Sequence, residues 1–112
     1  MNYTTEIVKF FDDKILLFHF EDGFNTLDTF FATDVPQFHS ILVREINRIL
    51  ARKKEEGCFT FNSCDITIRK EKCVVASLHT ADVYTCCEVP TEELLSLIKQ
   101  WVRMDNDLKS TK

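Results

Sequence analysis

The cysteine and histidine side chains of this chain could act as nucleophiles, bases or metal ligands, but their spacing fits none of these roles. The 112 residues include five cysteines and three histidines. Successive cysteines are six, nine, thirteen and one positions apart, with no CxxC or HxxxH pair, whereas zinc sites use closely spaced ligand pairs. A hairpin could bring Cys87 and His79 together as thiol and base, but no nearby glycine loop could form an oxyanion hole. We therefore expect no metal ion, no other cofactor and no enzymatic activity.

The cysteines fit a structural role in a reducing compartment better. Their number is odd, and the N-terminus lacks a basic region followed by an apolar stretch, so no secretory signal is indicated. The cysteines fall in expected strands, where cysteine packs as a small hydrophobe and where Cys86 and Cys87 point to opposite faces. No window approaches eighteen apolar residues without a charge, which argues against a membrane span. We expect a cytoplasmic protein that does not enter a membrane.

Carboxylates gather in the first 34 residues, where seven acidic side chains accompany only two lysines. The net charge of this part is −5, which exceeds the −4 of the whole chain. General acid–base catalysis needs two carboxylates that converge across a cleft, whereas the pairs Asp12-Asp13 and Glu21-Asp22 have the spacing of solvated turns. Charge gathered at one end of a chain concerns its partners, and an acidic balance argues against binding to nucleic acid.

A positively charged segment follows, because residues 35–57 carry a net charge of +2. Arg44, Arg48 and Arg52 recur every four residues, which places like charges on one side of an expected helix. This side of the helix is either solvated or, together with Ile41, a contact patch.

Hydrophobic spacing and turn residues predict the elements that position these groups. Two apolar runs broken by Asp12-Asp13 indicate a β-hairpin, and the pattern allows a short third strand after it. Asp34 is expected to cap a helix that Gly57 ends, and Thr91 to cap a second helix. The predicted strands are 4–11, 14–21, 29–33, 58–69, 73–79 and 83–89.

The order β-β-(β)-α-β-β-β-α predicts an α+β fold. We expect a mostly antiparallel β-meander sheet of five to six strands, with two amphipathic helices against one face. The apolar side chains of the first helix share one face: Val35, Phe38, Leu42, Ile46, Ile49 and Leu50. Two glycines and two prolines leave no flexible linker, so we expect one domain over residues 1–104 and a frayed tail over 105–112.

Two stretches of the second half combine an alternating strand with the start of a helix. They are residues 57–68 (GCFTFNSCDITI) and residues 89–101 (VPTEELLSLIKQW). Together with the charged turn and Val74-Val75 between them, they resemble the small acidic bacterial immunity proteins of contact-dependent growth inhibition and related polymorphic toxin systems. The resemblance covers the element order over about residues 4–104 and implies a cytosolic protein that blocks a toxin domain, commonly a nuclease. It carries over no active-site residue, because such inhibitors have none.

The acidic surface and this resemblance together predict a non-enzymatic immunity protein that occludes a cognate toxin with a basic active-site cleft. An acidic inhibitor gains long-range steering toward such a cleft. The alternative is a small adaptor or regulatory subunit that binds its partner through the first helix or a strand edge. A homodimer is one form that this alternative could take. The expected contact residues are Asp12, Asp13, Glu21, Asp22 and Asp28, with Asp82 and Glu88 as weaker candidates.

Overall fold

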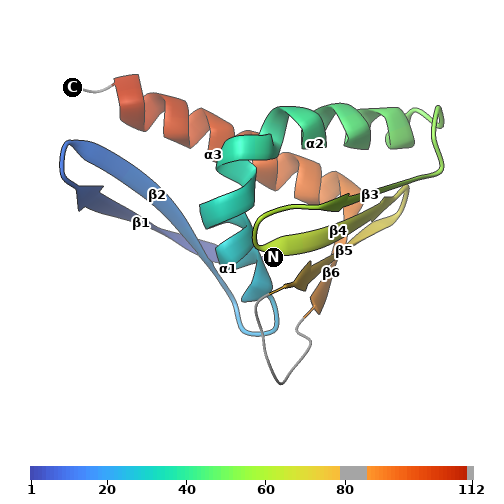
Figure 1. The fold of residues 1–112 in the computed structure, drawn as a ribbon, viewed down its shortest axis with the longest axis horizontal. Coiled ribbons are helices and arrows are strands. Elements are labelled where there is room, and N and C mark those ends of the chain that lie inside the picture. Colours follow the sequence, from blue (N-terminus) through green and yellow to red (C-terminus); the bar gives the residue numbers. More distant parts are fainter. Residues whose placement is uncertain (79–85, 111–112) are drawn as a thin grey trace.

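The computed structural model describes residues 1–78 and 86–110. Two antiparallel sheets flank a central helix, and two longer helices lie along one side of the molecule (Figure 1). The predicted α+β class is confirmed. The strands are β1 (Tyr3–Phe10), β2 (Asp13–Phe20), β3 (Glu56–Thr60), β4 (Cys64–Arg69), β5 (Lys72–Ser77) and β6 (Cys86–Pro90). The helices are α1 (Thr26–Thr29), the π-helical segment η1 (Phe30–Asp34), α2 (Val35–Leu50) and α3 (Thr91–Ser110).

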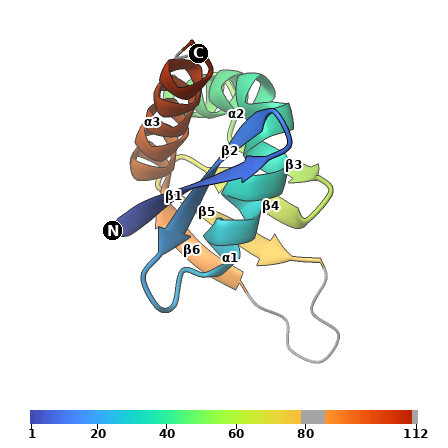
Figure 2. The same ribbon diagram turned by 90° about the vertical axis from the view of Figure 1, so that its left-hand side faces the viewer.

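The strands form two sheets, so the predicted single sheet of five to six strands is wrong. β1 and β2 pair only with each other among the described strands, and β3-β4-β5-β6 form a four-stranded meander. α1 and η1 contact β2 on one side, and α1 contacts β5 and β6 on the other (Figure 2). The helix between them keeps the two sheets apart.

The expected third strand over 29–33 is also wrong, because these residues belong to a helical run that starts at Thr26. Phe30 and Phe31 are fully buried, although neighbours on a helix point about 100° apart. Both directions are covered, since the hairpin and the four-stranded sheet lie on different sides of this helix. Burial on both sides therefore outweighed the local strand preference of the two phenylalanines.

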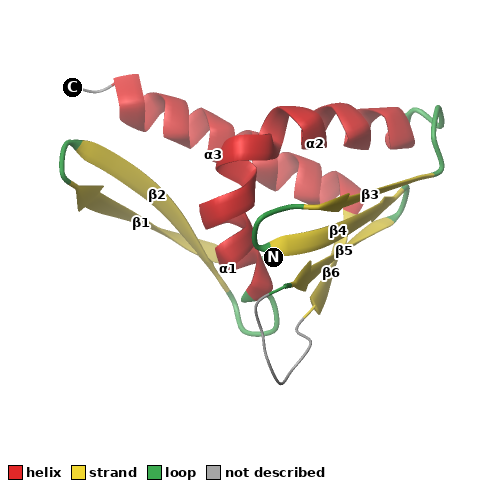
Figure 3. Cartoon of the chain, in the orientation of Figure 1, coloured by secondary structure: helices red, strands yellow, loops and turns green. Residues whose placement is uncertain are grey.

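The helical run turns sharply near η1, as Figure 3 shows. Pro36 has no N–H to donate, and its ring crowds the carbonyl of Ala32, so a regular α-helix cannot pass straight through. The π-helical turn just before Pro36 widens the backbone and lets the chain change direction.

Asp34 does not cap a helix, contrary to the prediction, because its side chain makes no capping hydrogen bond. Its buried carboxylate accepts hydrogen bonds from the backbone N–H groups of Asn62 and Ser63, both at 3.1 Å, and from the Ser63 hydroxyl at 2.8 Å. A buried carboxylate needs such donors to offset the loss of water. Asp34 thereby ties the bent helix to the turn between β3 and β4.

Gly57 does not end α2, contrary to the prediction. Arg52 takes the left-handed conformation with φ 61°, and the Lys53 N–H donates to the Arg48 carbonyl at 2.9 Å. This is the hydrogen bond of a Schellman ending, with arginine where glycine is usual.

Gly57 instead lies in β3 and makes room for the buried carboxylate of Glu45. A Cβ atom at position 57 would come within 2.8 Å of Glu45 Oε2. That carboxylate accepts a hydrogen bond from Lys54 Nζ at 2.7 Å, so the glycine makes room for a part-buried ion pair beside the sheet.

One face of the four-stranded sheet is buried against the helices. Ile66, Ile68, Val75 and Val89 are each exposed by 1% or less. The predicted strand over 58–69 is in fact the two strands β3 and β4, joined by a turn. The predictions for 73–79 and 83–89 correspond to β5 and β6, except that residues 79–85 lie outside the described part.

α3 starts at Thr91, so the predicted position of the second helix is confirmed. Thr91 is its first helical residue rather than its cap, because the Thr91 hydroxyl donates to the carbonyl of Arg69 in β4. The helix continues to Ser110 with Leu108 packed on the core, so the expected frayed tail is helical over 105–110. None of the helices in the described ranges has the length and apolar character that a membrane span requires.

Candidate functional site

The β1–β2 hairpin forms an arm that is anchored at one end and exposed at the other. At its base, the rings of Tyr3 and Phe18 stack at 4.3 Å, and Phe18 stacks on Phe31 of the central helix at 5.4 Å. The Tyr3 hydroxyl also donates to Gln100 of α3 at 2.5 Å. These contacts fix the direction in which the arm points.

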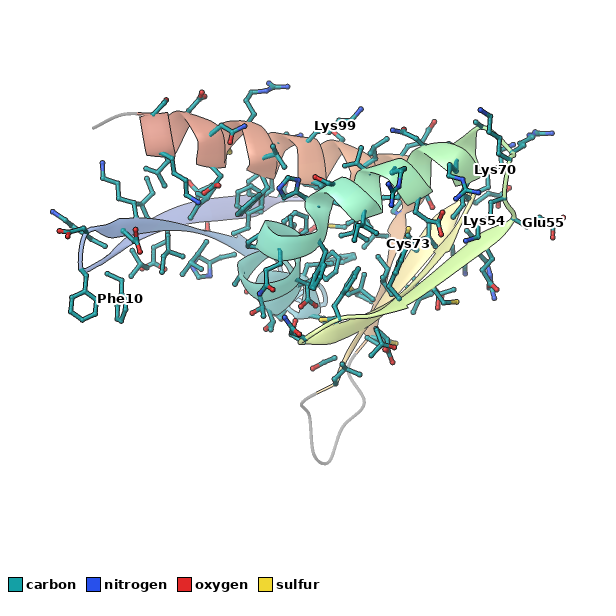
Figure 4. The ribbon with its side chains drawn as sticks, turned by 45° about the horizontal axis from the view of Figure 1, so that its top comes forward. Phe10, Lys54, Glu55, Lys70, Cys73 and Lys99 are labelled. Carbon is teal, nitrogen blue, oxygen red and sulfur yellow. The ribbon has the colours of Figure 1, made fainter. Side chains whose placement is uncertain are left out.

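Toward the tip, the same two strands leave large apolar side chains in solvent. Ile7 is 58% exposed, Phe10 59%, Phe11 85% and Ile15 41%. They are four of the six large hydrophobic side chains exposed in the described residues. Figure 4 shows Phe10 at the end of the hairpin, pointing away from the rest of the molecule. Large apolar side chains exposed on both faces of the hairpin near its tip mark this end of the arm as a candidate interaction surface.

Phe11 occupies a backbone conformation that its residue type does not favour. Phe10 pairs with Asp13, which leaves Phe11 and Asp12 as the two-residue loop, and Phe11 has φ 56°. A positive φ at the first loop position matches a type II′ turn, where glycine is preferred. A bulky residue there costs about 1 kcal/mol, and this one buries almost none of its ring in return. Among the described residues its ring contacts the ring of Phe10 at 4.7 Å, so a phenylalanine at this position adds nothing to the core of the protein.

Four of the five contact residues predicted within the first 34 residues lie at the two ends of the arm. Asp12 and Asp13 are at the tip, while Glu21 and Asp22 follow the base of β2. Eight-residue strands place the two ends about 25 Å apart. The two pairs therefore bracket the arm and are too far apart to act on one bond.

The other predicted contact residues have partners within the protein or lie outside the described residues. Asp28 accepts a hydrogen bond from the Phe20 N–H at 2.8 Å. Glu88 forms an ion pair with Lys72 across β5 and β6 at 3.1 Å. Asp82 lies outside the described residues.

Glu6 joins this acidic surface, although sequence reasoning missed it. Its carboxylate lies 2.8 Å from His19 Nε2, and Asp28 Oδ2 lies 3.9 Å from His19 Nδ1. The hairpin register could have revealed Glu6, because Thr4 pairs with His19 and Glu6 is on the same face as Thr4. No group of three His, Cys, Asp or Glu side chains in residues 1–78 and 86–110 could hold a metal ion.

The buried thiols are poorly suited to nucleophilic chemistry. Burial raises the pKa of the thiols of Cys64 and Cys73, and raises the pKa of Cys87 to about 11. A thiol with so high a pKa stays protonated at neutral pH. Cys86 is exposed where Cys87 is buried, so the two adjacent cysteines point to opposite faces as predicted. The pairing of Cys87 with His79 falls on a residue outside the described part.

A second surface, a groove of about 1010 Å³, lies between α2 and α3. The sequence indicated the arginines of α2, but only the fold brings the basic residues of α3 beside them. Arg52, the third arginine of the predicted stripe, does not line the groove. The basic side chains that line it are Arg44, Arg48, Lys53, Lys99 and Arg103.

Comparison of the chain with known protein families, with curated proteins and with solved structures found no match.

Proposed function

We propose that this protein is a non-enzymatic, cytoplasmic immunity-type protein that binds a cognate toxin domain and occludes its basic active-site cleft. The β1–β2 arm is the contact element in this proposal. The observation that carries it is Phe11, an 85% exposed aromatic side chain held at φ 56°. Residues that break a local folding rule without a gain in packing are expected at functional positions.

The shape of the arm supports insertion into a cleft. Its tip carries Phe10 and Phe11, whose rings lie edge to face at 4.7 Å. Aromatic side chains, phenylalanine included, are enriched at protein–protein interfaces compared with the rest of the surface. Asp12 and Asp13 beside them provide carboxylates that can pair with arginine or lysine where a phosphate would otherwise bind.

Charge supports the same orientation of the complex. The first 34 residues carry a net charge of −5, and the arm contributes the exposed carboxylates at both of its ends. A basic cleft attracts such a surface over a distance of about 10 Å at ordinary salt. The tip of the arm would therefore enter the cleft first, and the base of the arm would follow.

The first experiment is affinity capture from the native cell with the wild-type protein and the variant Phe10→Ser/Phe11→Ser. We expect the wild type to retain one toxin-like enzyme in a one-to-one complex and the variant to lose it. Leu78→Ser, which removes an exposed apolar side chain outside the arm, should retain it. Equal retention by the arm variant would refute the arm as the contact element.

The second experiment measures association with the captured enzyme at low salt. Reversal of Asp12, Asp13, Glu21 and Asp22 to lysine should slow association by about tenfold or more and leave unfolding by urea nearly unchanged. Glu55→Lys is the control, because Glu55 is an exposed carboxylate after α2 (Figure 4). An unchanged association rate would remove these residues from the interface.

A second candidate is an adaptor that dimerises through the outer edge of β1. That edge has no partner strand among the described residues, and a free edge can pair with a strand of another chain. Light scattering separates the two candidates, because the adaptor predicts a dimer whose mass does not change on dilution. A monomer favours the inhibitor.

A further inference from the structure

The groove between α2 and α3 has a charge opposite to that of the arm and lies on different elements. α2 contributes Arg44 and Arg48, the segment after it contributes Lys53, and α3 contributes Lys99 and Arg103. Figure 4 places Lys99 on the exposed side of α3 beside α2. No carboxylate lines the groove.

Most of these basic groups have no acidic partner among the residues that the structure describes. Arg48 Nη1 lies 3.7 Å from Glu45 Oε1. Across the part of the chain that the structure describes, no carboxylate oxygen lies within 4.0 Å of Arg44, Lys53, Lys99 or Arg103. Like charges four residues apart on one helix repel each other, so an anionic ligand would relieve repulsion along both helices.

The groove is lined in part by aliphatic side chains. Val43 of α2 and Val102 of α3 line it and are packed against the core. Ala51 also lines it, and the polar Ser40, Asn47 and Asn106 complete the lining beside them. The groove thus combines an apolar strip, formed by Val43 and Val102, with positive charges on both helices. A ligand that matches it must have an apolar face flanked by negative charges.

We propose that this groove binds an acidic amphipathic helix of a protein partner. Such a helix would place its apolar side chains on the strip of Val43 and Val102 and its carboxylates on the two basic rows. Arg44 and Arg48, and likewise Lys99 and Arg103, are four residues apart, a rise of about 6 Å along a helix. Carboxylates four residues apart on the bound helix have the same spacing, which is the usual geometry of helix-in-groove recognition.

Nucleic acid fits the groove less well than an acidic helix. Single strands bind through aromatic side chains on which bases stack, and His39 is the one ring that lines this groove. The net charge of −4 on the whole chain opposes a polyanion at long range. The apolar strip would also remain unused by phosphates.

The test uses a fluorescent synthetic peptide of about 18 residues, or five helical turns, with leucine on one face and glutamate on the others. We expect saturable binding to the wild-type protein that weakens as salt rises. Arg44→Glu/Arg103→Glu should weaken binding by about tenfold or more. The milder Arg44→Gln/Arg103→Gln should weaken it less, while circular dichroism shows both variants folded.

Two control arms make the result specific. Arg69→Glu/Lys70→Glu applies the same change of charge to two exposed residues, one at the end of β4 and one in the turn after it, and should bind the peptide like the wild type. A second peptide with glutamine in place of glutamate should bind at least about tenfold more weakly. Equal binding of the two peptides, or no effect of the groove variants, overturns the proposal.

An oligonucleotide of about 12 nucleotides is the third probe. Tighter binding of this probe than of the acidic peptide would assign the groove to nucleic acid and refute the protein partner. No toxin is present in this assay, and the arm variant Phe10→Ser/Phe11→Ser should still bind the peptide. The outcome is therefore independent of the function proposed for the arm.

Discussion

The β1–β2 arm and the β3–β6 sheet are both antiparallel, but they differ in what their apolar side chains contact. In the sheet, Ile66 and Val75 are exposed by 1% or less and face the helices. In the arm, Phe18 is equally buried at the base, whereas Ile7 is 58% and Ile15 41% exposed nearer the tip. One sheet buries a complete face, and the other buries only the end that touches the helices.

The difference shows which apolar residues serve folding and which do not. The sheet is tied to the helices by buried side chains and by the hydrogen bonds of Asp34. The outer part of the arm contributes no comparable packing, and Phe11 strains the turn that it occupies. Side chains that are apolar, exposed and costly to the fold are best explained by contact with another molecule.

The same substitution in the two sheets tests this comparison most strongly. Ile66→Ala should lower the free energy of unfolding by about 2–5 kcal/mol, because it opens a cavity in the core. Ile7→Ala should lower it by less than about 1 kcal/mol, because the side chain is mostly in solvent. Urea unfolding of both variants is the measurement. Equal losses would mean that the arm belongs to the core.

Removal of the carboxylate that ties the sheet to the bent helix should have the next largest effect. Asp34→Ala leaves the N–H groups of Asn62 and Ser63 without their acceptor, and should cost about 2–4 kcal/mol of unfolding free energy. Asp34→Asn keeps one acceptor oxygen and should cost less. If both variants unfold like the wild type, the turn between β3 and β4 is held by other contacts.

Alkaline pH should weaken the sheet through its buried thiols. The pKa of Cys87 is about 11 in the folded protein, against 9.0 for an ordinary thiol, so between these values the folded state keeps a proton that the unfolded state loses. The protonated Cys87 thiol stabilises the folded state fully below about pH 9, and this stabilisation is lost as the pH rises toward 11. The loss lowers the free energy of unfolding by about 2 kcal/mol. Chemical unfolding at about pH 8 and about pH 10.5 measures it. Cys87→Ala should show a smaller loss of stability over this window.

The close approach of Gly57 to Glu45 predicts a moderate effect on the edge strand β3. Gly57→Ala should cost about 1–3 kcal/mol, because the new methyl group displaces a buried carboxylate that is hydrogen-bonded to Lys54. In a Glu45→Ala background the same change should cost much less, since the obstructing side chain is gone. A double-mutant cycle by thermal or urea unfolding gives this coupling directly.

The smallest predicted change is a gain at the tip of the arm. Phe11→Gly should raise the free energy of unfolding by about 0.5–1 kcal/mol, because glycine accepts a positive φ without strain. The same variant should lose affinity for the partner of the arm. A loss of stability instead would show that the ring of Phe11 contributes to the fold.

The sequence supported several elements because their signals are local. The β1–β2 hairpin follows from two apolar runs around Asp12-Asp13, and the start of α3 follows from Thr91 and the acidic residues after it. The class of fold then follows from meanders and amphipathic helices.

Other features depend on contacts between distant segments. Residues 29–33 have the composition of a strand and become helical because two sheets cover them. Asp34 has the pattern of a helix cap, yet its hydrogen-bond donors lie at Asn62 and Ser63. The spacing of Arg44 and Arg48 in the sequence predicted that they share one side of a helix. That Lys99 and Arg103 line the same groove could not be predicted, because it depends on the packing of α3 beside α2.

The hydrogen bond from Tyr3 to Gln100 has a consequence for the order in which the chain folds during synthesis. The two residues are 97 positions apart, which corresponds to about 5–20 s of translation. Throughout that interval the residues of the hairpin lack α3, one of the two helices that hold the base of the arm. Its apolar strands are then available to chaperones or to neighbouring nascent chains, and the arm reaches its final direction only when α3 has been made.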